Sequence, residues 1–328
     1  MKFLPENVVN NDALIEWMAA GRPLKIRGSW IEHRTGIKQR HWAREDEACS
    51  DLAVAAATRL FEKYPDAKAE VRQLVLATIS GDFPTPPTAP LVQHRLGLEN
   101  IGALDLGAAC AGFVTGLHTT TALLAATGQT QLLIAADIRS KFLHREDLAT
   151  TALFGDGAAA CVVTQDSKDA SFRYIASELF SDGVVADIIS IQAGGSRLPF
   201  TRNKDPEKNF LKMQKGAVLF LKAAEGMAEG ATRFLTHLGL TIKDVDWMVP
   251  HQANLHLVRE VGNKLGISAD KVIETVQVTG NTSGASVGIA LDSLIERQVM
   301  KPGEKILLVA AGGGGLAACA LLETPDAS

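Results

Sequence analysis

The sequence predicts an α/β protein built from two similar halves. Short apolar runs typical of buried strands alternate with stretches of helical periodicity, a pattern that favours mostly parallel sheets. Three segments of the first half also recur in the second half at nearly equal spacing. The spacings are 174 residues from Val71 to Val245, 175 from Gly128 to Gly303 and 173 from Cys110 to Ser283. Three similar spacings in the same order indicate a duplicated unit.

The first half is expected to alternate helices with short buried strands. Asn10 can cap an amphipathic helix, and prolines break residues 83–90 into a loop. The expected helices cover residues 10–20 and 49–64 and a stretch that starts after Cys110, and the expected strands cover 74–79, 131–136 and a run ending at Val163. The first apolar strand, expected near Leu4, is almost missing.

The boundary between the halves is placed in the polar, non-periodic stretch from Gln165 to Ser171. Residues 1–168 then form the first half, and residues 169–328 form the second. The second half is expected to contain a strand-rich segment at 174–191, a charged loop at 197–208, helices at 218–238, 254–265 and 281–297, and strands at 245–249 and 305–311. Four glycines, Gly312–Gly315, follow the last of these strands.

The composition is that of a soluble globular protein. Hydrophobic residues make up 46% of the 328 residues, charged residues 21%, and the net charge is −4, which excludes the basic surface that nucleic-acid binding requires. We expect no membrane span and no secretion signal. Four cysteines without a CxxC pair indicate reduced thiols in the cytoplasm, and the scattered His and Cys residues predict no metal site.

The stretch from Ala103 to Leu117 is the candidate centre of the chemistry. An apolar run ends in small residues, delivers Cys110 and continues as an expected helix. Backbone N–H groups and the helix dipole at such a position favour the thiolate. Small neighbours leave room for a substrate. The alternative is a buried structural cysteine that acts as a small hydrophobic residue.

Three further sites follow expected strands in the second half. His251 comes directly after an apolar run, although a turn or capping histidine would give the same pattern. Asn281 precedes a helix, where an N-cap is the alternative interpretation. The glycine run Gly312–Gly315 exposes backbone N–H groups that can bind an oxyanion. Because ligands collect beyond the carboxyl ends of strands, we expect these sites to meet Cys110.

Together these residues fit thioester chemistry. A Cys110 thiolate attacks an acyl thioester, while its own N–H and that of a loop glycine hold the oxyanion. His251 and Asn281 stabilise the enolate formed when a malonyl thioester loses CO2. This reaction needs no metal or cofactor.

The sequence resembles β-ketoacyl-[acyl-carrier-protein] synthase III over nearly its whole length. The matching motifs are Trp30-Ile31, Arg34–Ile37, Ala109–Phe113, Phe154–Ala158, His251–Leu255, Gly280–Ser283 and Gly313–Gly315. The resemblance implies the thiolase fold, with duplicated α/β halves in a five-layer αβαβα arrangement, and a homodimer. It implies that Cys110 is the acylated nucleophile, that His251 and Asn281 assist decarboxylation and that Gly314 joins Cys110 in the oxyanion hole. The implied substrates are acyl-CoA and malonyl-[acyl-carrier-protein].

The resemblance also assigns substrate-binding residues. Trp30, Arg34 and Phe154 are expected to contact the CoA thioester. Leu148 stands where the family has an arginine that clamps the adenine, and Thr85 stands where acetyl-selective members have a phenylalanine. A smaller side chain in the loop containing Thr85 leaves volume for a longer acyl chain.

Carrier-protein docking is expected on the helix that follows His251. His256 occupies the family's basic docking position, and the cations that can replace its charge are Arg259, Lys264, Lys215 and Lys222. The expected function is the initiation of fatty acid biosynthesis. The alternatives are a relative in specialised metabolism that uses a medium-chain or aromatic primer, and an enzyme that only transfers acyl groups. A non-catalytic acyl-binding subunit is disfavoured by the presence of Cys110, His251 and Asn281.

Overall fold

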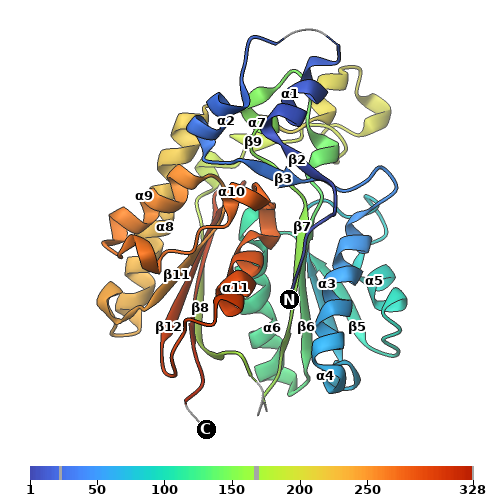
Figure 1. Ribbon diagram of the computed structural model, residues 1–328. Coiled ribbons are helices and arrows are strands. Elements are labelled where there is room, and N and C mark those ends of the chain that lie inside the picture. Colours follow the sequence, from blue (N-terminus) through green and yellow to red (C-terminus); the bar gives the residue numbers. More distant parts are fainter. Residues whose placement is uncertain (22–23, 166–169, 327–328) are drawn as a thin grey trace.

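The computed structural model describes residues 1–21, 24–165 and 170–326, which form five layers in the order αβαβα (Figure 1). Two sheets enclose a central pair of helices, and further helices cover the outer face of each sheet. The first sheet contains, in spatial order, β1 (Lys2–Phe3), β7 (Gly157–Val163), β6 (Gln131–Asp137), β4 (Gln73–Ala77) and β5 (Gly102–Leu106). The second contains β11 (Trp247–Pro250), β12 (Lys305–Gly312), β13 (Leu316–Glu323) and β8 (Arg173–Ser181). The predicted layered α/β fold is confirmed.

The helices divide between the central and outer layers. The central pair is α6 (Gly112–Thr127) and α11 (Ser286–Arg297). The outer helices are α3 (Cys49–Lys63), α4 (Pro65–Glu70) and α5 (Ala89–Arg95) on the first sheet, and α8 (Gly216–His237) and α9 (Leu255–Leu265) on the second. The one-turn helix α10 (Val276–Thr279) leads into the segment that carries Asn281.

Both sheets are mixed, so the expectation of mostly parallel sheets is wrong. The pairs β4–β5, β4–β6 and β11–β12 are parallel, whereas the other pairs within the two sheets are antiparallel. One cause is the glycine run, which turns the chain back at once into β13 instead of leading into a crossover helix. Gly314 and Gly315 have φ of 90° and 72°, values that glycine adopts readily.

The duplication is visible in the strand order. The order β4-β6-β7-β1 matches β11-β12-β13-β8, and the successive pairs are parallel, antiparallel and antiparallel in both sheets. The short turns η1 (Ala109–Ala111) and η8 (Ser283–Ala285) begin 174 residues apart, with left-handed φ of 45° and 51° at their first residues. This register pairs Ser283 with Ala109 and corrects the pairing with Cys110. The expected boundary at residue 168 lies outside the described residues.

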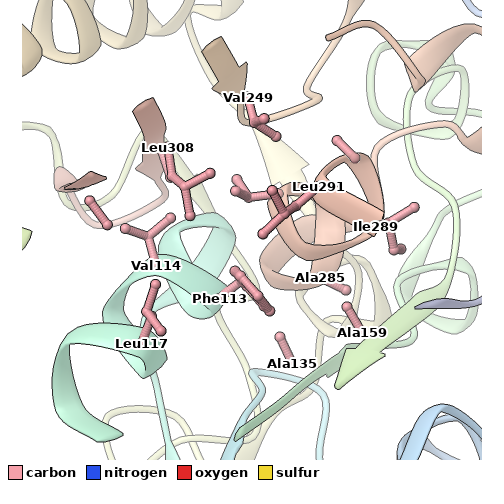
Figure 2. Packing of buried hydrophobic residues seen from close by; sticks show 14 of the residues in the cluster. Phe113, Val114, Leu117, Ala135, Ala159, Val249, Ala285, Ile289, Leu291 and Leu308 are labelled. Atoms are coloured by element: carbon pink, nitrogen blue, oxygen red, sulfur yellow. The ribbon is translucent and has the colours of Figure 1, made fainter. Parts of the chain in front are cut away.

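The core lies where the central helices meet both sheets (Figure 2). Val75 and Ala77 of β4 face the central helices, whereas Leu74 and Leu76 face α3, as the two-residue period of a strand requires. From the other sheet, Val249 and Leu308 pack against the same helices, and the labelled residues of Figure 2 come from all three inner layers. This packing fixes the starts of α6 and α11 relative to each other.

The segment Ala109–Thr127, which comprises η1 and α6, is long and apolar enough to cross a membrane, with a mean hydropathy of 1.3, and it is the one such helix in the described part of the chain. The sequence analysis expected no membrane span, and this segment has the length and composition of one. The segment packs against strands of both sheets. The position of α6 between the two sheets accounts for its apolar composition.

A cap covers the end of the sheets where the candidate residues lie (Figure 1). It contains β2 (Val8–Asn10), α1 (Asn11–Ala19), α2 (Gly28–Thr35), β3 (Gln39–His41), α7 (Leu148–Thr151), β9 (Ile189–Ser190) and β10 (Lys212–Met213). Asn10 caps α1 as expected, because its side chain accepts the N–H of Ala13 at 2.8 Å. The fully buried Arg40 of β3 holds parts of the cap together by donating to the carbonyl of Ala152, the residue after α7, at 2.9 Å.

The short first strand keeps its place at the edge of the first sheet. β1 pairs through two residues with Ala158 and Ala159, and the amino group of Met1 donates to the Ala160 carbonyl at 2.7 Å. The matching strand β8 pairs along the whole of β13. The expected helices near 49–64, 218–238 and 254–265 are confirmed as α3, α8 and α9.

Candidate active site

A cavity of about 1080 Å³ brings Cys110, His251 and Asn281 together. Cys110 follows β5 and His251 follows β11, whereas Asn281 follows the helix α10, so the expectation that Asn281 comes directly after a strand is wrong. The glycine loop contributes Gly312, Gly313 and Gly315 to the same wall. The three residues therefore line one cavity, as predicted.

Cys110 occupies the turn η1 directly before α6. Ala109 adopts a left-handed φ of 45°, which turns the chain sharply out of β5. The Cys110 sulfur lies 3.8 Å from the Ser283 hydroxyl in the matching turn. The glycine loop packs close behind it, since a Cβ placed on Gly312 would lie 2.9 Å from the Cys110 nitrogen. Cys110 keeps some exposed surface because it faces the cavity.

The electrostatics of Cys110 differ from the sequence expectation. Burial raises the pKa of the Cys110 thiol, and the nearby Asp137 carboxylate adds to this effect. The Ser283 hydroxyl, the Arg139 guanidinium and the Gly313 N–H lower the pKa but do not offset burial. In the protein without substrate the thiol is thus favoured, although the helix N-terminus alone would favour the thiolate.

His251 follows β11 and is almost fully buried. Its backbone N–H donates to the Val309 carbonyl at 2.8 Å, and its Nδ1 lies 2.6 Å from the Ser286 hydroxyl. Burial lowers the pKa of the imidazole to about 4, so the ring is neutral at pH 7. Asn254, not His251, caps α9 by accepting the N–H of Leu257 at 2.9 Å. The interpretation of His251 as a capping residue does not hold.

Asn281 is held by the backbone on both sides. Its N–H donates to the Leu153 carbonyl at 2.8 Å, and its carbonyl accepts the N–H of Gly155 at 3.0 Å. Its side-chain Oδ1 accepts the N–H of Ser283 at 2.9 Å. The residues at the N-cap positions of η8 and α11 are Thr282 and Ala285, so the interpretation of Asn281 as an N-cap does not hold. The Nδ2 group makes no hydrogen bond to any residue that the structure describes, which leaves it available to a ligand in the cavity.

The segment Phe154–Ala158 supports this arrangement. Phe154 forms a backbone bridge with Asn281 and also lines the cavity. The buried Asp156 carboxylate accepts the N–H groups of Ala43 and Arg139, each at 2.7 Å, and so joins the segment to the cap. Asp156 therefore orders the backbone instead of facing the cavity.

The expected substrate-binding residues divide into two groups. Trp30, Arg34 and Leu148 line the cavity with Phe154, and the Arg34 guanidinium lies 5.6 Å from the centre of the Trp30 ring. Thr85 lies in an exposed loop and does not line this cavity among the described residues.

Gly313 lines the cavity, and its backbone N–H lowers the pKa of the Cys110 thiol. Gly314, the glycine expected in the oxyanion hole, is not among the described lining residues. Sequence analysis did not assign Ser283, Ser286 or Gly313. Both serines belong to the run of small polar residues that leads into α11. The Ser283 hydroxyl contacts Cys110, and the Ser286 hydroxyl contacts His251.

Three of the expected docking residues, His256, Arg259 and Lys264, lie on α9 outside the cavity, whereas Lys215 is the N-cap of α8 and Lys222 lies on α8. His256 is exposed, with Nε2 3.1 Å from the His33 carbonyl. Arg259 forms a two-point ion pair with Glu274, through bonds of 2.7 and 3.1 Å, and Lys264 lies 3.8 Å from Glu260. Lys222 lines the cavity and lies 3.8 Å from Glu225. The Arg259 charge is therefore already paired within the chain.

Comparisons with known proteins agree with this geometry. Family models described as 3-oxoacyl-[acyl-carrier-protein (ACP)] synthase III and its C terminal match residues 104–183 and 235–324. The chain is 37% identical to a β-ketoacyl-[acyl-carrier-protein] synthase III of Oleidesulfovibrio alaskensis, over 90% of both chains. It is 38% identical to a 3-oxopimeloyl-[acyl-carrier-protein] synthase of Rhodothermus marinus, over 92% of this chain and 87% of the relative.

The fold matches as well. The crystal structure of 3-oxoacyl-(acyl carrier protein) synthase III from Pseudomonas aeruginosa superposes with a TM-score of 0.85 at 33% identity, covering 100% of this chain and 97% of that one. The five-layer arrangement is thus the thiolase fold of these enzymes. The chain belongs to the 3-oxoacyl-[acyl-carrier-protein] synthase III family.

Proposed function

We propose that this chain condenses an acyl primer with malonyl-[acyl-carrier-protein], with loss of CO2, and so initiates fatty acid biosynthesis. The observation that supports this most directly is the shared cavity, in which a thiol from one half meets an imidazole and a carboxamide from the other. The family to which the chain belongs carries the reaction type. The substrates are thioesters, and the chemistry requires no cofactor.

In the first half-reaction, Cys110 takes the acyl group from acyl-CoA. The sulfur forms a bond to the thioester carbonyl carbon, the bond from that carbon to the CoA sulfur breaks, and the Cys110 proton ends on the released CoA thiol. Two backbone N–H groups hold the oxyanion, that of Cys110 and one from the glycine loop. Gly314 is our expectation for the second donor, and the nearby Gly313 N–H is the alternative.

In the second half-reaction, the malonyl thioester enters beside His251 and Asn281. Its carboxylate leaves as CO2, and the electron pair that remains forms an enolate on the thioester oxygen. A neutral imidazole and the free Asn281 amide can each donate a hydrogen bond to that oxygen. The enolate carbon then attacks the acyl carbonyl, Cys110 leaves as the thiolate, and the β-ketoacyl product stays on the carrier protein.

The primer enters past Trp30 and Arg34, and the carrier protein docks over α9 near His256 and Lys264. Because Arg259 is paired with Glu274, Lys264 is the better candidate for an acidic partner. The assembly we propose is a cytoplasmic homodimer. Among the described strands, β5 pairs only with β4 and lies at the edge of the first sheet, which supports a dimer formed through that edge.

The test is an acyl-CoA screen read by intact mass. Wild-type protein mixed with acetyl-, octanoyl- or aromatic CoA should gain the mass of one acyl group, and Cys110→Ala should gain none. The Cys110 position must also carry the group in a peptide digest. Wild type without added mass in every mixture would contradict an acyl-enzyme reaction.

A second candidate function is supported by the relative named 3-oxopimeloyl-[acyl-carrier-protein] synthase and by Leu148 at the cavity mouth. In this alternative the chain is a specialised enzyme with a larger primer. The same screen separates the two, since preference for acetyl-CoA indicates the primary pathway and preference for a longer or aromatic acyl group indicates the specialised one. Acylation without any CO2 release from malonyl-[acyl-carrier-protein] would indicate an acyltransferase only.

A further inference from the structure

The Ser286 hydroxyl has a contact that the sequence analysis did not assign. Ser286 begins α11 and is buried, and its Oγ lies 2.6 Å from the Nδ1 of His251. The backbone N–H of Gln252 also points at this oxygen, at 3.4 Å. These are the two hydrogen-bond partners that Oγ has among the described residues.

The two contacts determine where the hydroxyl proton goes. A backbone N–H only donates, so towards Gln252 the Ser286 oxygen is an acceptor. A buried hydroxyl proton left without an acceptor costs about 1–3 kcal/mol. The His251 Nδ1 is the one acceptor within reach among the described residues, so the hydroxyl donates to it. Nδ1 then carries no proton, and the single proton of the neutral ring lies on Nε2.

The Nε2 atom of His251 is available to a substrate in the cavity. It makes no hydrogen bond to a described residue, and His251 lines the cavity beside Asn281. We propose that Ser286 is a positioning residue that fixes His251 in the Nε2–H tautomer, so that Nε2 donates to the malonyl thioester oxygen. This inference rests on the proposed function. Without the hydroxyl, the ring is free to adopt the other tautomer, which would turn a lone pair towards the enolate.

The duplicated fold shows that this hydroxyl is particular to the second half. In the register that pairs the turns η1 and η8, Ser286 stands opposite Gly112, the first residue of α6. Gly112 lies so close to Gly284 that a Cβ there would come within 3.1 Å of the Gly284 Cα. The first half thus has close backbone packing at the position where the second half has a hydrogen-bond donor.

The test compares the two half-reactions in full-length wild type, Ser286→Ala and Ser293→Ala. Ser293 lies on the same helix, away from the cavity, and provides the matched control. We expect Ser286→Ala to slow CO2 release from malonyl-[acyl-carrier-protein] at least tenfold while Cys110 acylation by octanoyl-CoA stays within about twofold of wild type. The control should match wild type in both. CO2 release by Ser286→Ala within twofold of wild type would overturn the inference.

A second measurement depends neither on the folding of Ser286→Ala nor on enzymatic activity. In wild-type protein labelled with ¹⁵N-histidine, the His251 signals are assigned by their absence in His251→Gln. We expect an unprotonated Nδ1 and a protonated Nε2. A protonated Nδ1 would overturn the inference even if the enzyme condenses thioesters, whereas an inactive wild type with the expected tautomer would count against the proposed function alone.

Discussion

At the scale of residues, each candidate catalytic residue is held by contacts with a segment distant from it in the sequence. Cys110 lies against Ser283 and the glycine loop, and Asn281 is held by the backbone of Leu153 and Gly155. Cys110, His251 and Asn281 were predictable because each stands in a short motif that resembles those of the family. The roles of Ser283 and Ser286 were not predictable, because they depend on contacts with Cys110 and His251 that only the folded chain brings about.

The close approach of Gly312 to Cys110 leads to a prediction on acylation. In Gly312→Ala the new Cβ would lie 2.9 Å from the Cys110 nitrogen and 3.1 Å from that of Ala111, so the N–H that holds the oxyanion must shift. We expect acylation of Cys110 to slow by about 100-fold, the usual cost of losing one oxyanion donor. Gly107→Ala, which adds its Cβ to open space near the same turn, is the control and should acylate normally. A normal rate for Gly312→Ala, followed by intact mass over time, would contradict this account.

At the scale of elements, the starts of α6 and α11 are brought together by small residues. Gly288 of α11 lies directly over Phe113 of α6 and Ala159 of β7. The sequence predicted both helices but not the strand β13, because the run Leu316–Glu323 has no polar alternation and follows four glycines that end the preceding pattern. The mixed direction of the second sheet follows from that hairpin, which no periodicity in the sequence could indicate.

The packing of Gly288 predicts a loss of stability on enlargement. A Cβ in Gly288→Ala would come within 2.6 Å of both the Ala159 Cβ and a Phe113 ring carbon. We expect the free energy of unfolding to fall by about 1–3 kcal/mol, as for other overpacked cores. Gly226→Ala in α8 meets no atom within 4 Å and should instead raise it by up to about 1 kcal/mol through helix propensity. Urea unfolding of the two variants checks both signs, and a stabilised Gly288→Ala would show that the helix interface is looser than described.

At the scale of the whole molecule, the duplicated fold supplies the cavity from both halves. Equal spacings of similar segments predicted the duplication, and the structure refined its register to 174 residues at the turns. The spacing alone could not identify which residues would touch, because the contact between η1 and η8 arises from the pseudo-twofold packing of the two units. This arrangement buries His251, and burial disfavours the protonated form of its imidazole.

That burial predicts a pH dependence of global stability. The folded-state pKa of His251 is about 4, below the ordinary value of about 6.5, so the unfolded chain takes up the proton first as the pH falls. The contribution to stability is complete above pH about 6.5 and is lost towards pH about 4, which amounts to about 2 kcal/mol at pH 5. Urea unfolding at pH 7 and pH 5 measures this loss, and in His251→Gln the loss should be smaller by the same amount. Equal losses in both proteins would contradict a buried neutral imidazole.

The most direct test of the central claim is a single turnover on protein already acylated at Cys110. The acylated protein is mixed with one equivalent of malonyl-[acyl-carrier-protein], and CO2 release is followed together with the mass of the protein. Cooperation of Cys110, His251 and Asn281 in one cavity requires that each molecule lose its acyl group as one CO2 and one β-ketoacyl product appear, and that His251→Ala and Asn281→Ala keep the acyl group. Protein that stays acylated in the wild type, or loses its acyl group equally fast in both variants, would contradict it.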